Sequence, residues 1–415
     1  MSNTVVVTGS GSLLNSTGPI TVGDTGSGVL TIGSGATVTA PWIQIANSNN
    51  ATGILNIGSI GGSDTSVTLN ATNIFFGTNG GTAILNFNQA DTATIASVIS
   101  GNGSLNQFGN GTTILTGYNT YNGATIVSAG ILQYGDGTTN QFVTSTTNGP
   151  VTNAPGYVSQ LGGNGTITLN GGTIAFAQYN TLTNNSVISG NGSLAQLGVN
   201  YTLGGTNYSV GTTILTANNN YIGGTLVSGG ALQVGTNGIT GSIGNGTVTL
   251  TNSASLIYDR ADNTALVNAF VGTGNLTFIG AGTTTLSGSS AYNGFTTIDG
   301  TAVVVTGSIN GNGLGRFVVG STKNGSSLTF TSGGTNSANS LQVGGSSNSS
   351  GNNMIVDNAT VNLAATIGVG ASASSGNSLT VQNGGNVSGG NLYVGLGSSN
   401  GPIASVNNTL TITGP

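Results

Sequence analysis

Short runs of β-forming residues alternate with polar turns along the whole chain. The runs are rich in Val, Ile, Leu, Phe and Thr, and clusters of Gly, Asn, Ser and Thr separate them. No long stretch repeats its apolar residues with the 3.6-residue period of a helix. The pattern therefore predicts an all-β protein with very short strands. The clearest predicted strands are Thr4–Thr8, Val29–Ile32, Ile54–Ile57, Thr82–Phe87, Thr113–Thr116, Thr247–Thr251, Val303–Thr306, Leu379–Val381 and Leu410–Ile412.

A long internal repeat organises the middle of the chain. Residues 111–135 (GTTILTGYNTYNGATIVSAGILQYG) align without a gap to residues 211–235 (GTTILTANNNYIGGTLVSGGALQVG), at an offset of 100. Upstream, VISGNGSL occurs at residues 98–105 and again at 187–194, at an offset of 89, so 11 additional residues lie within about 199–210. A third, weaker copy begins at Gly282.

The two ends of the chain have a shorter repeat. In the C-terminal quarter, Val-Gly pairs recur at intervals of 24, 26 and 25 residues, beginning at Val319, Val343, Val369 and Val394. A repeat of roughly 20–26 residues is typical of one coil of a β-solenoid. We therefore predict N-terminal solenoid coils in residues 1–89, three long repeat units in 90–307, and C-terminal coils in 308–415.

The stacking of coils explains why these residue types recur. Each short strand pairs with the equivalent strand of the next coil, about 4.8 Å away. Inward positions form ladders of apolar side chains, while Gly and Asn occupy the corners because they adopt positive φ at little cost. Charged residues are disfavoured, because identical positions lie beside one another in successive coils. About 18 such coils predict a single elongated rod on the order of 85 Å long.

The composition excludes most kinds of chemistry. The chain has 75 glycines, three basic residues and eight acidic residues, all of them Asp, and it contains no Glu, His or Cys. General acid–base catalysis needs a tuned pair of groups or a His, so we expect no enzyme activity, no cofactor and no metal site. The net charge is −5 and no basic patch occurs, which argues against nucleic acid as a partner. No apolar run approaches the length of about 18 residues that spans a bilayer, so we expect no membrane insertion.

The central motif resembles a known repeat family. Residues 101–135 (GNGSLNQFGNGTTILTGYNTYNGATIVSAGILQYG) are similar to the passenger-associated β-strand repeat of autotransporters, and residues 256–262 (LIYDRAD) resemble the lead-in segment of that repeat. The flanks at residues 22–40 and 377–395 are similar to other autotransporter surface repeats. The resemblance implies a right-handed parallel β-helix on a bacterial surface. Neither a secretory signal nor the alternating strands of a translocator barrel is recognisable, so we expect a passenger segment or a stand-alone solenoid built from such repeats.

Four features are candidates for ligand binding, and each also has a structural interpretation. Asp259, Arg260 and Asp262 form the one charge cluster of the sequence, which is either a ligand patch or, as we favour, a surface pair in a loop. The turns GGSD (61–64) and YGDG (134–137) could bind calcium, but Asp shows no periodicity. Irregular Thr-x-Thr elements fit strand propensity better than ice binding. Seven tyrosines gather around the repeats and either stack on sugars or close solenoid corners, namely Tyr118, Tyr121, Tyr134, Tyr201, Tyr208, Tyr221 and Tyr292.

These observations predict an extracellular, non-enzymatic structural β-solenoid on a bacterial surface. Strand-like residues occur close to both ends of the sequence, and an uncovered strand edge invites pairing with another chain. We therefore expect copies of the chain to join head to tail into a filament. The alternative is a monomeric passenger or adhesin that binds glycans or a host surface. The residues expected at the joint are Thr4, Val5, Val6, Val7, Leu410, Thr411 and Ile412.

Overall fold

The computed structural model describes residues 3–77, 79–137, 165–203, 205–346, 349–371, 374–396 and 405–414. Within these ranges the regular secondary structure consists of strands joined by turns and bends, which confirms the predicted all-β class. The internal contacts divide the chain into two compact units. Unit 1 comprises Met1–Thr213 with Ala217–Gly223, and unit 2 comprises Ile214–Thr216 with Gly224–Pro415.

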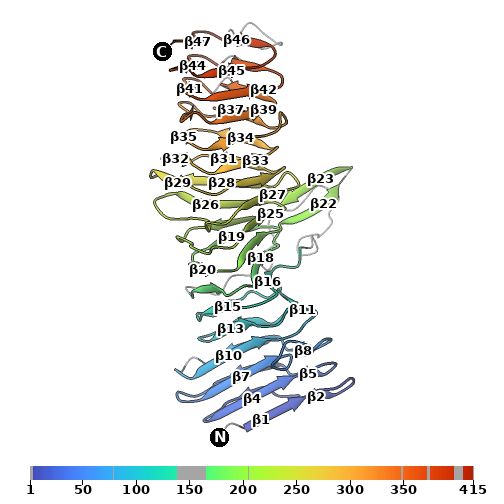
Figure 1. The fold of residues 1–415 in the computed structure, drawn as a ribbon. Helices are drawn as coiled ribbons and strands as arrows, with labels where there is room; N and C mark the ends of the chain where they lie inside the picture. The colour runs from blue at the N-terminus through green and yellow to red at the C-terminus, as the bar shows by residue number, and fades with distance from the viewer. Residues whose placement is uncertain are drawn as a thin grey trace, which may run out of the picture. The chain divides into compact units, whose positions relative to one another are not determined.

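Unit 1 is a stack of short parallel strands in four ladders (Figure 1). The first ladder contains β1 (Asn3–Val7), β4 (Ser27–Ile32), β7 (Thr52–Ile57), β10 (Thr82–Phe87), β13 (Ser104–Gln107), β15 (Thr125–Val127), β17 (Ile167–Leu169) and β20 (Ile188–Gly190). The second contains β3 (Ile20–Val22), β6 (Trp42–Ile45), β9 (Asn73–Phe76) and β12 (Val98–Ser100). The third contains β2 (Leu13–Asn15), β5 (Thr37–Thr39) and β8 (Thr68–Asn70). The fourth includes β11 (Thr92–Ile95), β14 (Thr112–Leu115), β16 (Ile131–Tyr134), β18 (Thr173–Phe176) and β21 (Ser193–Gln196).

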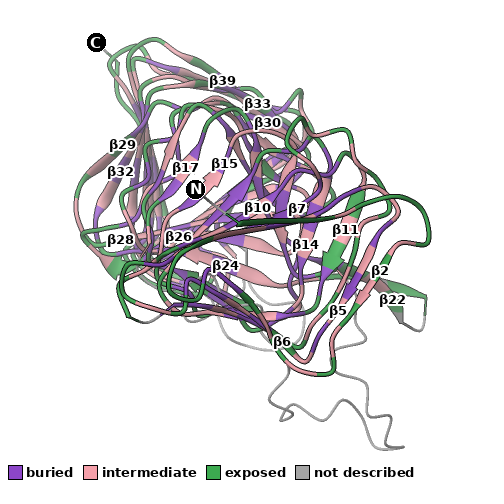
Figure 2. Ribbon diagram, turned by 90° about the horizontal axis from the view of Figure 1, so that it is seen from below, coloured by how far each residue is buried: buried purple, intermediate pink, exposed green. Residues whose placement is uncertain are grey.

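The core of unit 1 consists of ladders of identical or similar side chains. Leu30, Leu55, Leu85 and Leu105 pair in register on β4, β7, β10 and β13, and all four are buried. On the opposite face of the same strands, the Asn86 side chain donates to Asn56 Oδ1 at 2.8 Å. Inward apolar and outward polar ladders alternate because successive residues of a strand point to opposite faces. Figure 2 shows this alternation of buried and intermediate positions on strands such as β7 and β10.

Unit 2 is built in the same way. One ladder contains β26 (Ala231–Gly238), β28 (Ser255–Arg260), β31 (Asn275–Phe278), β34 (Phe295–Ile298), β37 (Arg316–Val319), β40 (Ser340–Val343), β43 (Ile367–Ala371) and β46 (Leu392–Leu396). A second contains β29 (Thr264–Leu266), β32 (Thr283–Leu286), β35 (Ala302–Val305), β38 (Ser327–Phe330), β41 (Asn353–Asp357), β44 (Ser378–Gln382) and β47 (Thr409–Ile412). A third includes β25 (Thr225–Val227), β27 (Val248–Leu250), β30 (Phe270–Gly272), β33 (Ser289–Tyr292) and β36 (Ser308–Ile309), and a fourth contains β39 (Thr335–Ala338), β42 (Thr360–Leu363) and β45 (Asn386–Ser388).

The Val-Gly pairs predicted from the sequence mark one corner of the coils in unit 2. Gly344 adopts a φ of 79°, and a Cβ atom there would lie 2.5 Å from Asn377 Nδ2. Only glycine fits, because a side chain would meet both an unfavourable backbone conformation and the next coil. The asparagines behind this corner form the Asn corner ladder, defined here as Asn352, Asn377 and Asn408. Asn377 Oδ1 accepts from the Asn352 backbone N–H at 3.1 Å, and Asn408 Oδ1 accepts from the Asn377 N–H at 3.0 Å.

The insertion predicted within about 199–210 is a separate element. β22 (Val199–Leu203) and β23 (Thr206–Val210) pair antiparallel, whereas the other strand pairings described in either unit are parallel. In Figure 1 this hairpin extends away from the stacked coils of unit 1. β19 (Thr181–Asn184) precedes β20 in unit 1, and β24 (Thr212–Leu215) follows the hairpin.

The parallel β-helix expected from the sequence is confirmed. Thr82–Phe87 has the predicted bounds, and the predicted strand Thr4–Thr8 is observed at Asn3–Val7. The three sequence regions 1–89, 90–307 and 308–415 stay a prediction, and the division between the two compact units falls inside the second region.

Candidate functional site

The first coil of unit 1 exposes side chains that point into the core in every later coil. β1 is the first strand of its ladder and pairs with β4 alone, with Val5 beside Leu30 and Val7 beside Ile32. Leu30 and Ile32 are buried, so Val5 and Val7 are the inward positions of β1. Val5 is nevertheless 53% exposed. On the side away from β4, the first coil therefore exposes apolar side chains whose equivalents in later coils are buried in the core.

The other two strands of the first coil continue this apolar surface. Leu14 on β2 pairs with the buried Val38, and Ile20 on β3 pairs with the buried Ile43. A hollow of about 330 Å³ lies at this end of unit 1. Its lining includes Val5, Leu14, Ile20, Val22 and Leu30.

The last coil of unit 2 has the equivalent feature. β47 is the last strand of its ladder, with Leu410 beside Leu379 and Ile412 beside Val381. Both partners are buried, so Leu410 and Ile412 are inward positions, yet Ile412 is 73% exposed. A hollow of about 230 Å³ lies here, lined by Ile367, Leu379, Val381, Gly385, Asn386, Val387, Leu392, Leu410 and Ile412.

Two sets of inward apolar residues therefore lie at the surface. Val387, Leu392 and Val394 are also inward positions, because they pair with the buried Val361, Ile367 and Val369. We call Val5, Val7, Leu14 and Ile20 the N-terminal coil face, and Val387, Leu392, Val394, Leu410 and Ile412 the C-terminal coil face. Each face also has a strand edge, β1 or β47, that pairs with one neighbour in its ladder. A further strand adds to a sheet by pairing with an open strand edge and by covering the apolar side chains beside it, and each face offers both features.

The predicted joint residues divide into two groups within these strands. One group points inward, because each of its members pairs with a buried residue of the adjacent strand in the ladder: Val5, Val7, Leu410 and Ile412. The alternate residues Thr4, Val6 and Thr411 point outward, beside Val29, Thr31 and Thr380. The sequence did not identify Leu14, Ile20, Val387 or Leu392 as members of the same faces. Their position in alternating runs near the first and last strands is the signal that could have found them.

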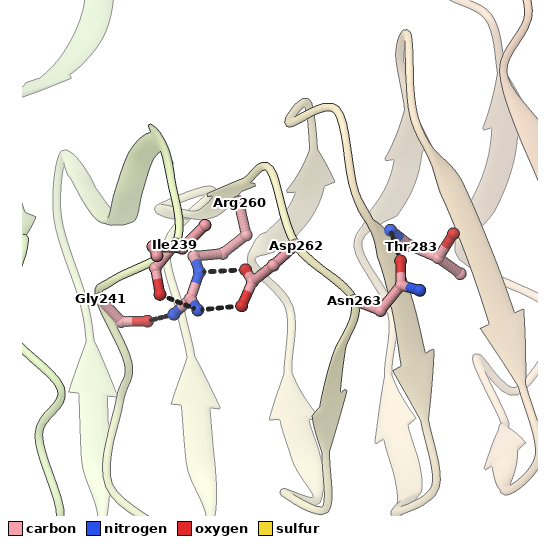
Figure 3. A network of polar contacts seen from close by, with 6 residues as sticks. All are labelled: Ile239, Gly241, Arg260, Asp262, Asn263 and Thr283. Atoms are coloured by element: carbon pink, nitrogen blue, oxygen red, sulfur yellow. Dashed lines mark hydrogen bonds and ion pairs between the residues drawn. The ribbon is translucent and has the colours of Figure 1, made fainter.

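The charge cluster is structural. Asp262 lies in a bend ahead of β29 and is partly exposed, as the structural interpretation expected, whereas Asp259 and Arg260 belong to β28 and do not form a surface loop. Arg260 ends β28 and is 7% exposed. Its Nε donates to Asp262 Oδ1 at 2.9 Å and its Nη2 donates to Asp262 Oδ2 at 2.8 Å, while Nη2 and Nη1 also donate to the carbonyls of Ile239 and Gly241 (Figure 3). The guanidinium thus connects the segment after β26 to the end of β28. Burial of this cation is tolerated because its N–H donors have hydrogen-bond acceptors.

The pKa values of the two neighbouring carboxylates, Asp259 and Asp262, shift in opposite directions. The hydrogen bond from Arg260 lowers the pKa of Asp262, whereas partial burial raises the pKa of Asp259. Asp259 accepts a hydrogen bond from Gln233 at 3.2 Å. Each carboxylate has a partner on its own or an adjacent strand, so the cluster holds the backbone rather than a ligand.

The Asp-containing turn at residues 61–64 is also occupied by the protein itself. Asp64 Oδ1 accepts from Ser34 Oγ at 2.6 Å, and Oδ2 accepts from the Ser59 N–H. Partial burial raises the pKa of Asp64, but these hydrogen bonds outweigh it and the net pKa is lowered. No group of three or more His, Cys, Asp or Glu side chains gathers within the described parts of the chain.

The tyrosines separate into buried and exposed sets. Tyr121, Tyr221 and Tyr292, which occupy equivalent repeat positions, are at most 1% exposed. Tyr121 Oη lies 2.7 Å from Thr125 Oγ1 and 3.0 Å from Tyr134 Oη, and burial raises the pKa of Tyr121. These rings fill the core at a corner, as the structural interpretation expected.

Unit 1 has a broad hollow that could accommodate a polysaccharide, and an enzyme that cleaves polysaccharides would need paired carboxylates there. Its volume is about 830 Å³, and its described lining includes Asp136 among small residues such as Thr72, Ser97 and Thr116. Glycoside hydrolysis uses two carboxyl groups that flank the scissile bond, and the described lining supplies one. Over the described ranges, no helix is both long and apolar enough to cross a bilayer.

The long repeats match a family model. The model of the passenger-associated transport repeat matches residues 105–133, 210–234 and 276–300, and each match covers strands of successive parallel ladders. Three segments of the chain are thus similar to this repeat. The resemblance predicted from the sequence is therefore confirmed.

A curated relative extends this similarity beyond the repeats. The chain is 32% identical over 256 residues to the Adhesin BmaC autotransporter of Brucella suis biovar 1. The alignment covers 50% of this chain but 7% of the relative, so the chain spans a small part of the relative's length. No solved structure matches the chain.

Proposed function

We propose that this chain is an extracellular passenger-type β-solenoid with a structural, non-enzymatic role, and that copies of it join head to tail. The three matches to the passenger-associated transport repeat and the similarity to an autotransporter adhesin support the extracellular passenger role. The single observation that carries the assembly is the pair of open coil faces. Inward apolar residues on β1 and on β47 are exposed there beside unpaired strand edges.

A head-to-tail joint fits the chemistry of these faces. A second copy that places its N-terminal coil face on the C-terminal coil face keeps its strands parallel to the first copy, as between successive coils. Four apolar side chains of the N-terminal coil face and five of the C-terminal coil face would then be covered, and full burial of one Val, Leu or Ile contributes roughly 1.5–3 kcal/mol. Asp24 lines the hollow at the N-terminal coil face, and the described lining of the C-terminal hollow has no charged side chain, so no like-charge repulsion opposes the contact. Because the two faces differ, the joint is heterologous and leads to an open filament.

Negative-stain microscopy combined with matched variants tests the assembly. Val5 and Val6 are neighbours on β1 with exposed fractions of 53% and 57%, but Val5 points inward and Val6 outward. We expect the wild-type protein to form fibres much longer than the roughly 85 Å predicted for one chain. The Val5→Asp variant should abolish them, because it places a charge in an apolar joint, while Val6→Asp should keep them.

A mixing experiment distinguishes head-to-tail joining from other contacts. Ile412→Asp disables the C-terminal coil face and leaves the N-terminal face intact, so each single variant should remain monomeric. An equimolar mixture with Val5→Asp retains one working joint and should give dimers and no longer species, measured by light scattering after size exclusion. Wild-type protein that stays as single particles, or fibres that survive both substitutions, would contradict the assembly. In that case the alternative of a monomeric adhesin is favoured, since the passenger repeats do not depend on the joint.

A further inference from the structure

The hairpin β22–β23 is an addition to a repeat that closes without it. In the first repeat, Gly109 and Gly111 are separated by Asn110, whereas in the second the equivalent Gly198 and Gly211 are separated by residues 199–210. The coil therefore needs one residue at this point and has twelve in the second copy. The additional residues form a two-stranded antiparallel ribbon instead of a further rung. Such an insertion has no role in closing the coil, so its sequence is not fixed by the repeat.

One face of the hairpin carries a stack of tyrosine rings. Tyr201 and Tyr208 are directly opposite each other on the two strands, and their ring centroids lie 5.1 Å apart at an interplanar angle of 13°. Tyr179, which follows β18, continues the stack at 6.2 Å and 29° from Tyr201. Tyr208 is the outer ring and is 41% exposed. β23 pairs with β22 alone in its sheet, so the stack ends at an open strand edge.

The surroundings of the stack are polar and uncharged. The hairpin sequence VNYTLGGTNYSV contains no charged residue, and Asn200, Thr202 and Ser209 are exposed around the rings. A hydrogen bond with Tyr179 raises the pKa of Tyr201. Rigid tyrosine rings with Ser, Thr, Gly and Asn beside them are the combination that recognition loops use, because the rings supply area and the others supply hydrogen bonds.

We propose that the Tyr179–Tyr201–Tyr208 stack on hairpin β22–β23 is a binding site for a neutral polysaccharide. A pyranose ring has an apolar C–H face that packs on the outer face of Tyr208, and a rim of hydroxyl groups that bonds to the neighbouring Asn, Ser and Thr side chains. The absence of charge from the hairpin sequence disfavours acidic glycans and nucleic acids, whose binding depends on cationic side chains. The site goes beyond the proposed structural role and does not depend on the terminal coil faces.

Affinity electrophoresis on native gels tests the site directly. The probes are the neutral polysaccharides laminarin, xylan, galactomannan and dextran, with alginate as an acidic comparison. We expect at least one neutral polysaccharide, and not alginate, to retard the wild-type protein. Isothermal titration with that probe should give a dissociation constant that Tyr208→Ala weakens by about two- to tenfold, the effect of losing one aromatic contact. Tyr118→Ala is the matched control, because Tyr118 is 43% exposed on the same unit and should not change the binding.

A second variant removes the hairpin, with Tyr201 and Tyr208, without removing a rung. Replacing residues 199–210 with a single Asn restores the spacing of the first repeat. This variant should lose the retardation while its circular dichroism and its fibres in the microscope stay as in the wild type. Retardation by alginate alone, by none of the probes, or equally by the wild type and the hairpin-less variant would overturn the proposal. Fibre formation is recorded on the same samples, so a failure here is distinguishable from a failure of the head-to-tail joint.

Discussion

Replacing Asn377 with alanine tests how much the Asn corner ladder stabilises unit 2. Asn377 is fully buried, and its side chain takes part in four hydrogen bonds. Its Oδ1 accepts from the backbone N–H and the Nδ2 of Asn352 at 3.1 and 3.0 Å. Its Nδ2 donates to Ser374 Oγ at 3.1 Å and to Asn408 Oδ1 at 2.9 Å. Alanine removes all of these and leaves the coil otherwise unchanged.

The size of the effect follows from which partners find a substitute. Asn352 Nδ2 still donates to Ser349 Oγ at 3.0 Å, and Asn408 Oδ1 still accepts from the Asn377 N–H at 3.0 Å. The Asn352 backbone N–H loses the acceptor that the ladder gives it, and an unsatisfied buried donor costs about 1–3 kcal/mol. The other lost hydrogen bonds contribute roughly 0.5–1.5 kcal/mol each. The free energy of opening this region should therefore fall by about 3 to 6 kcal/mol.

Hydrogen exchange read by mass spectrometry is the appropriate assay, because repeats lose stability locally. A decrease of 3 kcal/mol accelerates exchange by at least about a hundredfold. We expect this acceleration in peptides from β41, β44 and β47, and no change in peptides from β4 and β7 of unit 1. The exposed Asn391→Ala is the control and should leave exchange unchanged. An acceleration of less than about tenfold would refute the ladder as a stabilising network.

Two further predictions concern the charged groups of unit 2. Arg260→Met should lower the free energy of unfolding by about 2 to 4 kcal/mol, because the carbonyls of Ile239 and Gly241 lose a buried donor. Urea titration followed by circular dichroism measures this free energy. Asp262→Asn should lower it by less than Arg260→Met does. For Asp299, partial burial raises the pKa, but hydrogen bonds from Thr322 and Lys323 outweigh it and lower the pKa below 3.8. Its stabilisation is complete above that pH and is lost as the pH falls toward the folded-state pKa. The Asp299→Asn variant should lose less stability than the wild type between pH 6 and pH 3 in the same titration, and equal losses would contradict this prediction.

The alternation of apolar and polar residues predicts most strand positions, because each strand is short and its inward residues are fixed by the strands above and below. The repeat offset also locates the insertion before β24. Its conformation as an antiparallel hairpin was not predicted, although Gly204–Gly205 between two alternating runs is a recognised signal for a tight hairpin turn. The parallel period of the repeat gives no information on the insertion, because these residues lie outside the repeat.

Other features depend on contacts that the sequence does not place together. Arg260 was expected at the surface because charged residues are seldom buried. The two carbonyls that accept its hydrogen bonds come from residues 239 and 241, in the segment that follows the preceding strand of its ladder. Likewise, the exposure of Val5 and Ile412 does not follow from their residue types, since equivalent residues elsewhere are buried. It follows from their having a neighbouring strand on one side only.

The same physical rule connects the coil faces and the hairpin. Within the stack, Leu55 packs between Leu30 of the preceding coil and Leu85 of the following coil, so a substitution in one coil alters the packing of both neighbours. Residues that recognise something outside the stack must therefore lie where this constraint is absent, namely at a strand with one neighbour or in an insertion that leaves the stack. β1 and β47 meet the first condition, and β22–β23 meets the second. This is why both proposals are placed there, and not on the broad hollow beside Asp136, whose described lining belongs to strands and turns that continue the stack.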